Sequence, residues 1–265
     1  MKSIKRYEDL TAKQLKSFQD QGCIILLSFG SLEQHSSHLP VGTDFLCSQA
    51  RVEKIARETE SIVFTPIQIG YSFNHLGMFG TVSFTAETML SVIYEILISL
   101  CKQGWKKILI FSGHAGNWPT IEVAVQKTKE HFPSEQIALA RNYPRMSHSH
   151  NLGRFYKSFD LHAGLVETAI VSYYFNDLLD KNNIPKGNNK IPNSIKNIIS
   201  KEQLDDVDEL LIKTLIPQHT SLVSSTGNWG IGDPSCYSNV PVKEAMENYC
   251  NFFIKFIERW KKIEV

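Results

Sequence analysis

Apolar and polar positions alternate along the chain in a repeating order, with an apolar run followed by a segment of helical spacing. Residues 23–29, 61–69 and 106–112 are rich in apolar side chains, as expected of strands covered on both faces of a sheet. The segments between them place apolar residues three or four positions apart, as on one face of a helix. Helices are predicted over residues 11–20, 45–58, 86–103, 119–132 and 241–262, and a fourth strand over residues 136–141.

Strands that alternate with helices of this length predict an α/β fold, in which a mostly parallel sheet lies between two layers of helices. We expect one domain over residues 1–265, because a chain of 265 residues that is 42% hydrophobic can bury a single large core. The polar stretch 181–209 is predicted to be an exposed excursion. In such a fold, ligands bind at the carboxyl ends of the strands.

The formal net charge is +1 and has no long runs of one sign, so nothing predicts binding to nucleic acid or to an anionic membrane. A small molecule or a peptide is the expected partner. Five cysteines without a CxxC pair predict reduced thiols. The amino terminus lacks the apolar core of a signal peptide, and no apolar run approaches the roughly 20 residues that span a bilayer. We therefore expect a soluble, cytoplasmic protein.

Residues 30–44 follow the first apolar run and contain several side chains that can bind metal. If the backbone stays extended beyond the strand, Glu33 and His35 point the same way, and Asp44 can return to them after a short loop. This set of carboxylates and an imidazole indicates a divalent metal site of the Zn, Mn or Fe kind. The alternative is a surface loop in which Asp44 caps a helix that begins near Phe45.

A second polar turn, residues 112–117, follows the third strand and opens a helix. One interpretation is a glycine-bearing turn that binds phosphate at a helix amino terminus, although the lysine of a P-loop is missing. The other is that His114 is a metal ligand, with Gly113 and Gly116 allowing close approach of the backbone. Because Glu33, His35 and Asp44 are predicted at the same sheet edge, we favour the second interpretation.

A third candidate segment, residues 160–168, begins an apolar helix. Glu167 shares its helical face with apolar residues, where a carboxylate is costly unless it is paired or binds a metal. The alternative is an acidic residue in a first helical turn, stabilised by the helix dipole. His162 is either a capping residue or a proton shuttle. The glycine-rich residues 227–234 either close over the cleft or form a plain surface turn.

These motifs together resemble the creatininase (creatinine amidohydrolase) family. The resemblance rests on GSLEQH at 30–35, HLPVGTD at 38–44, GHAGN at 113–117 and HAGLVET at 162–168, with further support at 74–75, 80–81 and 232–234. It implies a metal-dependent amidohydrolase that acts on carbon–nitrogen bonds, with an α/β fold, two divalent metal ions and a homo-oligomeric, often hexameric, assembly. It also implies a small-molecule amide as the substrate.

The resemblance carries roles to individual residues. It implies the metal ligands Glu33, His35, Asp44 and His114, with Asp44 bridging the two ions. In creatinine-hydrolysing relatives a Glu two residues after the counterpart of His114 helps to bind metal, and here that position is Gly116. Glu167 is its expected replacement. His162 matches the histidine that handles protons. Asn74 and His75 are expected to orient the substrate.

We therefore hypothesise hydrolysis of a cyclic or non-standard amide by a hydroxide that bridges two divalent ions. Those relatives also carry a tryptophan shortly before the proton-handling histidine, where this chain has Ser158, so creatinine is not the expected substrate. The alternatives within the family are a formamide deformylase and a small-peptide peptidase. From other classes, the alternatives are a non-catalytic metal-binding or small-molecule-binding protein and a phosphate-binding enzyme.

Overall fold

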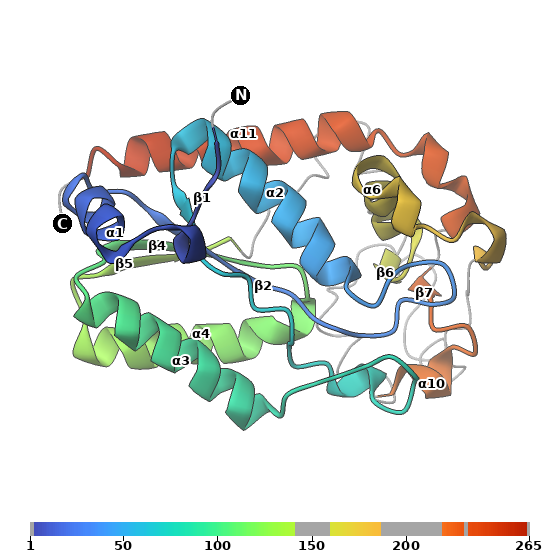
Figure 1. Cartoon of the computed structure of the whole chain (residues 1–265). Helices are drawn as coiled ribbons and strands as arrows, with labels where there is room; N and C mark the ends of the chain where they lie inside the picture. Colours follow the sequence, from blue (N-terminus) through green and yellow to red (C-terminus); the bar gives the residue numbers. More distant parts are fainter. Residues whose placement is uncertain (1–2, 141–159, 187–218, 231–232, 264–265) are drawn as a thin grey trace, which may run out of the picture.

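The computed structural model describes residues 3–140, 160–186, 219–230 and 233–263. Its centre is a five-stranded parallel sheet in the order β1-β3-β2-β4-β5 (Figure 1). The strands are β1 Lys5–Arg6, β2 Ile25–Phe29, β3 Ile62–Val63, β4 Lys107–Ser112 and β5 Gln136–Leu139. The prediction of an α/β fold with a mostly parallel sheet is confirmed.

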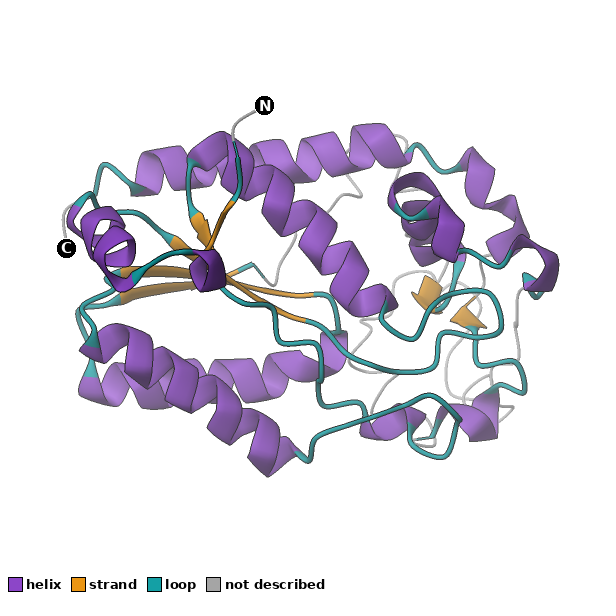
Figure 2. Ribbon diagram, viewed as in Figure 1, coloured by secondary structure: helices purple, strands orange, loops and turns teal. Residues whose placement is uncertain are grey.

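Helices cover both faces of this sheet (Figure 2). The α-helices are α1 Ala12–Asp20, α2 Thr43–Thr59, α3 Ala86–Lys102, α4 Trp118–His131, α6 Leu165–Tyr174, α10 Thr220–Val223 and α11 Val242–Trp260. Short 3-10 helices occupy η1 Tyr7–Asp9, η2 Phe73–His75, η3 Ala115–Asn117, η5 Asn176–Leu178, η6 Lys181–Asn183 and η7 Pro234–Asn239. In Figure 1, α2 and α11 lie on one face of the sheet, and α3 and α4 lie on the other.

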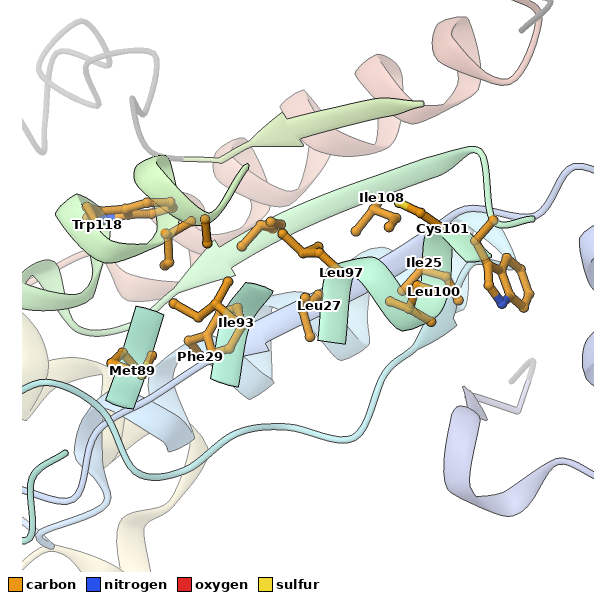
Figure 3. Packing of buried hydrophobic residues seen from close by; sticks show 14 of the residues in the cluster. Ile25, Leu27, Phe29, Met89, Ile93, Leu97, Leu100, Cys101, Ile108 and Trp118 are labelled. Atoms are coloured by element: carbon orange, nitrogen blue, oxygen red, sulfur yellow. The ribbon is translucent and has the colours of Figure 1, made fainter. Parts of the chain in front are cut away.

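The alternation of side chains along β2 explains this layering, because successive residues of a strand point to opposite faces. Leu27 and Phe29 face α3, where they pack with Ile93 and other buried residues in one hydrophobic cluster (Figure 3). Ile24 and Leu26 face α2 and α11 and belong to a second cluster. All residues of β2 are buried, as its continuous apolar run predicts.

A third hydrophobic cluster supports the end of the molecule at which the polar turns gather. It joins α6, the first half of α11 and Cys47 of α2. Beside it, the short strands β6 Asp160–His162 and β7 Trp229–Gly230 pair in antiparallel fashion. Within the residues that the structure describes, no helix combines the length and apolar character that crossing a bilayer requires.

Most predicted elements are present within one or two residues of the expected bounds. Thr11 caps α1, since it accepts a hydrogen bond from the backbone of Gln14 in a capping box. The strand predicted over residues 61–69 is much shorter, because β3 ends at Val63 and only Ile67 returns to the sheet as an isolated bridge. Pro66, which has no backbone N–H, interrupts this stretch. Of the predicted excursion 181–209, residues 187–209 lie outside the described part of the chain.

Candidate metal centre

The turns after β2, β3 and β4 meet at one end of the sheet, as expected for the carboxyl ends of parallel strands. Glu33 follows β2 and lies at the centre of the contacts between these turns. Its Oε2 atom is 3.1 Å from Nδ1 of His114, which follows β4. Its Oε1 atom is 3.5 Å from Nε2 of His75, which follows β3. Glu33 is only 1% exposed, so these contacts are shielded from solvent.

The loop between β2 and α2 brings two further predicted residues to the same place. Ser36 has a left-handed backbone conformation with φ of 62°, which turns the chain directly after His35. Asp44 lies inside the first turn of α2, which begins at Thr43, and Gly42 is the N-cap residue. The alternative that Asp44 caps a helix beginning near Phe45 is therefore wrong. Its carboxylate is instead free to face His35 and His114.

Asp44 lies between two groups of potential metal ligands. Its Oδ2 atom is 3.2 Å from Nδ1 of His114, and its Oδ1 atom is 3.5 Å from Nε2 of His35. One group consists of Glu33, Asp44 and His114, and the other of His35, Asp44 and Glu167. Within each group, the candidate ligand atoms all lie within 4.8 Å of one another. The two oxygens of one carboxylate thus face two different groups.

Backbone carbonyls orient the two imidazoles of these groups. Nδ1 of His35 donates to the carbonyl oxygen of Glu33 at 3.0 Å, and Nε2 of His114 donates to that of Tyr71 at 3.0 Å. A carbonyl can only accept, so in the neutral rings the lone pairs are on Nε2 of His35 and Nδ1 of His114. These are the atoms that face the carboxylates. Metal-ligating histidines typically show this arrangement.

Glu167 lies in the first turn of α6, close to both Ala163 and His35. Its Oε2 atom accepts a hydrogen bond from the backbone N–H of Ala163 at 2.7 Å and is 3.7 Å from Nε2 of His35. Its helical face is lined by buried residues such as Gly164 and Ile170, as predicted, although the Glu167 side chain itself is 28% exposed. Its position near a helix amino terminus is also as the alternative described. Both interpretations of Glu167 are compatible with this geometry.

His162 and His75 complete the cluster. His162 lies in β6, with Nδ1 at 3.5 Å from Oε1 of Glu33. Its ring centroid is 4.0 Å from that of His75 and 4.3 Å from that of His35. The alternative that His162 caps the helix is wrong, because Gly164 is the N-cap residue of α6. A third group of potential ligands consists of Glu33, His35 and His162.

The structure places Asn74 beside this cluster, in η2 with His75. Its Oδ1 atom is buried and has no hydrogen-bond partner in the described part of the chain. Two residues that contact the cluster were not predicted from the sequence. Ser72 donates a hydrogen bond to Oε2 of Glu33 at 2.5 Å, and Gln34 contacts His75 and His162 through its amide. Both residues lie in the polar turns after β2 and β3. Their location in these turns is the only sequence feature that could have indicated a role at the site.

The charges of the cluster depend on one another. Burial alone would raise the pKa of Glu33, but the charge and the hydrogen bond of His114, together with the charge of His75, lower that pKa to about 2. Burial alone would lower the pKa of His35, but the negative charge of Asp44 raises it to about 10. Without a metal ion, protonated histidines therefore balance the buried carboxylates. Burial dominates at His75 and lowers its pKa to about 4.

The donor set suits divalent metal ions better than an anion. Nε2 of His35 and Oδ2 of Asp44 are buried and have no hydrogen-bond partner among the described residues. A cation between the groups would satisfy both atoms. The phosphate interpretation of residues 112–117 is disfavoured, because His114 lies against two ionised carboxylates that would repel an anion. A Cβ atom at Gly113 would come within 2.0 Å of the backbone oxygen of Asp44, so this glycine allows close approach as predicted.

The chain is similar to several characterised proteins. A 3-dehydro-scyllo-inosose hydrolase of Thermotoga maritima is 27% identical over 52% of this chain and 44% of its own length. A creatinine amidohydrolase of Pseudomonas putida is 27% identical over 41% of this chain and 44% of its own length. A mycofactocin precursor peptide peptidase of Mycolicibacterium smegmatis is 30% identical over 43% of this chain and 47% of its own length. The matched segments thus span less than half of each of these relatives.

Solved structures match over a greater length. A crystal structure of creatinine amidohydrolase superimposes with a TM-score of 0.80 at 16% identity, covering 99% of this chain and 100% of that one. Two further creatininase structures, one of a mutant described as Zn–Zn type and one described as Mn, superimpose with TM-scores of 0.79 and 0.77 at 16% and 17% identity. Both cover 98% of this chain and 100% of the other. These likenesses show a shared fold.

The family model for creatinine amidohydrolase matches residues 8–257, which is nearly the whole chain and includes all of the segments that form the cluster. The match agrees with the resemblance of the four motifs and with the parallel sheet between layers of helices. The protein belongs to the creatininase family.

Proposed function

We propose that this protein is a metal-dependent hydrolase that cleaves a non-standard or cyclic amide bond and binds two divalent ions at the cluster around Asp44. The observation that carries this proposal is the position of Asp44, whose two carboxylate oxygens face two separate groups of ligands. A single carboxylate shared in this way is suited to hold two ions as a pair.

The proposed ligands divide between the two ions. Glu33 and His114 would hold one ion, His35 and Glu167 would hold the other, and Asp44 would be shared by both. The carbonyls that accept from the outer nitrogens of His35 and His114 support this division, since they leave the inner nitrogens available to a metal. Zn, Mn and Fe all accept such mixed carboxylate and imidazole ligands.

Bound divalent ions would supply Lewis-acid polarisation of the amide carbonyl and would lower the pKa of water. The protein groups then perform the positioning and the proton transfers. His162, which is neutral because burial lowers its pKa, can take up at Nδ1 the proton that the attacking water loses and pass it to the departing nitrogen. The buried position of Glu33 and His35 keeps bulk water away from the reacting groups.

The substrate we propose is a small amide, because the relatives include an amidohydrolase and a peptidase. A formamide and a short peptide are the alternatives inside this class. Creatinine itself is not favoured, since no tryptophan occurs between Trp118 and Trp229. A second candidate function is non-catalytic binding of a metal or small molecule.

The test begins with protein stripped of metal by a chelator and then reconstituted with Zn, Mn or Fe. Metal content is measured by mass spectrometry, and hydrolysis is assayed on cyclic amides, N-formyl amines and short peptides. We expect about two ions per chain and turnover that requires them. The variant His162→Gln should keep its ions and lose turnover. Turnover without metal would overturn the proposal, whereas binding of an amide to the loaded protein without turnover would favour the non-catalytic alternative.

A further inference from the structure

Gln34 lies between Glu33 and His35 in the sequence, but it belongs to none of the groups of potential ligands. It is only 5% exposed. Its Oε1 atom accepts a hydrogen bond from the backbone N–H of Ser36 at 3.0 Å, and its Nε2 atom donates to the carbonyl oxygen of Gly227 at 3.0 Å. If the Gln34 amide were rotated by 180°, its oxygen would face the carbonyl oxygen of Gly227, and its NH₂ group would face the backbone N–H of Ser36. These two backbone contacts therefore fix which end of the amide faces the histidines.

Gly227 is suited to this contact. Its φ of 83° lies in the left-handed region, and a Cβ atom there would come within 1.9 Å of Oε1 of Gln34. Its own N–H donates to Oγ of Ser224 at 3.0 Å, and Ser224 in turn donates to the carbonyl of Asn228 at 2.6 Å. This closed turn holds the Gly227 carbonyl in place as the acceptor for Gln34.

At His162 the contact that decides the position of the proton is with the main chain of Gln34. Nε2 of His162 is 2.7 Å from the carbonyl oxygen of Gln34, which can only accept. A neutral ring must then carry its hydrogen on Nε2 and its lone pair on Nδ1. The amide nitrogen of Gln34 is 3.0 Å from the same Nε2 atom, but this longer contact joins two donors. The second amide hydrogen of Gln34, which is not bonded to Gly227, is therefore available to a partner other than His162.

At His75 the ring nitrogen that contacts Gln34 accepts a hydrogen bond, whereas at His162 it donates one. Its Nδ1 atom is 3.2 Å from the amide nitrogen of Gln34, which can only donate, so Nδ1 must accept. The ring hydrogen of His75 is then on Nε2, the atom that lies 3.5 Å from Oε1 of Glu33. Thr220 contacts the same Nδ1 atom at 2.9 Å, but a hydroxyl can donate or accept and so does not decide the tautomer. The Gln34 amide decides it.

We propose that Gln34 is a positioning residue that gives the neighbouring rings of His75 and His162 opposite hydrogen-bonding character at the metal centre. His162 presents a lone pair, as His35 and His114 do, whereas His75 presents an N–H. On the basis of the proposed hydrolase function, His162 then accepts and returns the proton, and His75 donates a hydrogen bond to the substrate. His75 is absent from all three groups of potential ligands.

The tautomers can be measured directly by two-bond ¹H–¹⁵N correlation spectra of protein labelled at histidine, which separate protonated from unprotonated ring nitrogens. The spectra are recorded without substrate, both metal-free and with Zn, and the signals are assigned with the variants His75→Gln and His162→Gln. We expect hydrogen on Nε2 and a lone pair on Nδ1 in both rings. Hydrogen on Nδ1 of His162 or of His75 would overturn the proposal without any variant of Gln34.

Two substitutions then test the role of the amide. Gln34→Glu replaces the donor by an acceptor, so His75 should move its hydrogen to Nδ1 while His162 keeps it on Nε2. Gln34→Met removes the donor and should give a mixture at His75. The control is Gln21→Met, since Gln21 is exposed and bonds to Ser17 at 3.1 Å. An unchanged His75 tautomer in both Gln34 variants would overturn the proposal.

Activity provides a second and separable readout. If an amide substrate is found, Gln34→Met should lower kcat roughly 10- to 100-fold, the usual effect of removing a group that orients a catalytic one. Metal content should stay unchanged. Failure of the proposed function would appear as absent turnover with the expected tautomers. Failure of the present inference would appear as the wrong tautomers, whether or not the protein is active.

Discussion

Oδ2 of Asp44 lies 3.2 Å from Nδ1 of His114, although one residue belongs to the start of α2 and the other follows β4. The backbone at Gly113 makes this approach possible, because its N–H bonds to the carbonyl of Phe29 at 2.9 Å and its missing side chain leaves room for the backbone oxygen of Asp44. The contact connects the two halves of the proposed metal centre through one carboxylate.

Replacement of Asp44 should therefore affect both ions, and replacement of Glu167 only one. We expect Asp44→Ala to bind no metal at concentrations that saturate the wild type, and Glu167→Gln to keep about one ion per chain. Metal analysis after gel filtration measures both values. Asp20→Asn is the matched control, because Asp20 is an exposed residue of α1 that pairs with Lys16. Two ions retained by Asp44→Ala would rule out the shared position.

Gly116 should not tolerate a side chain. A Cβ atom there would lie 2.3 Å from Nε2 of His114 and 2.8 Å from the carbonyl oxygen of Tyr71. It would disrupt the hydrogen bond that orients His114, so we expect Gly116→Ala to weaken metal binding roughly 10- to 100-fold and to cost about 1–3 kcal/mol of stability. Metal titration and urea unfolding measure these effects.

The comparison for Gly116→Ala is Gly42→Ala. A Cβ atom at Gly42 would meet only Cδ2 of Leu32, at an ordinary distance of 3.8 Å. This control should bind metal as the wild type does. Equal metal affinity in the two variants would show that the space next to His114 does not matter.

Local patterns predicted the main strands and helices, because β2 and β4 are continuous apolar runs and the helices have regular apolar faces. Local patterns did not predict the short strands β1 and β7. β1 consists of Lys5 and Arg6, and β7 of Trp229 and Gly230, so neither is long enough to show alternation. Their pairing depends on partners distant in the sequence, which a local pattern does not contain.

The same division holds at the metal centre. The predicted residues Glu33 and His114 carry metal-binding groups directly after strands, so their residue type and position together were informative. Gln34 and Ser72 have no such signature. Gln34 acquires its role from Gly227, a contact across 193 residues of sequence, and Ser72 from a contact with Glu33 across 39 residues. Such roles become visible only when the fold is known.

Metal removal should destabilise the protein, since the folded state holds the proposed ligands together and the unfolded chain does not. At free metal 100-fold above the dissociation constant, binding contributes about 2.7 kcal/mol to the free energy of unfolding. A chelator should therefore lower the Tm of the wild type, and added Zn or Mn should restore it. In Asp44→Ala neither treatment should change the Tm. A chelator effect of equal size in this variant would place the relevant metal elsewhere.

His38 should make the protein sensitive to mild acid. It is 1% exposed and its Nε2 atom contacts Oγ1 of Thr168 at 2.8 Å, while Nδ1 has no hydrogen-bond partner among the described residues. Burial, followed by the charge of His35, lowers its pKa from the ordinary 6.5 to about 4. Between these pH values the unfolded chain binds the proton more readily, so the free energy of unfolding falls as the pH falls from 6.5 towards 4.

Urea unfolding measures this loss of stability. The free energy of unfolding should fall less over this pH range in His38→Gln than in the wild type or in His219→Gln, a substitution at an exposed position. An equal fall in the free energy of unfolding in all three proteins would show that protonation of His38 does not contribute to the acid sensitivity.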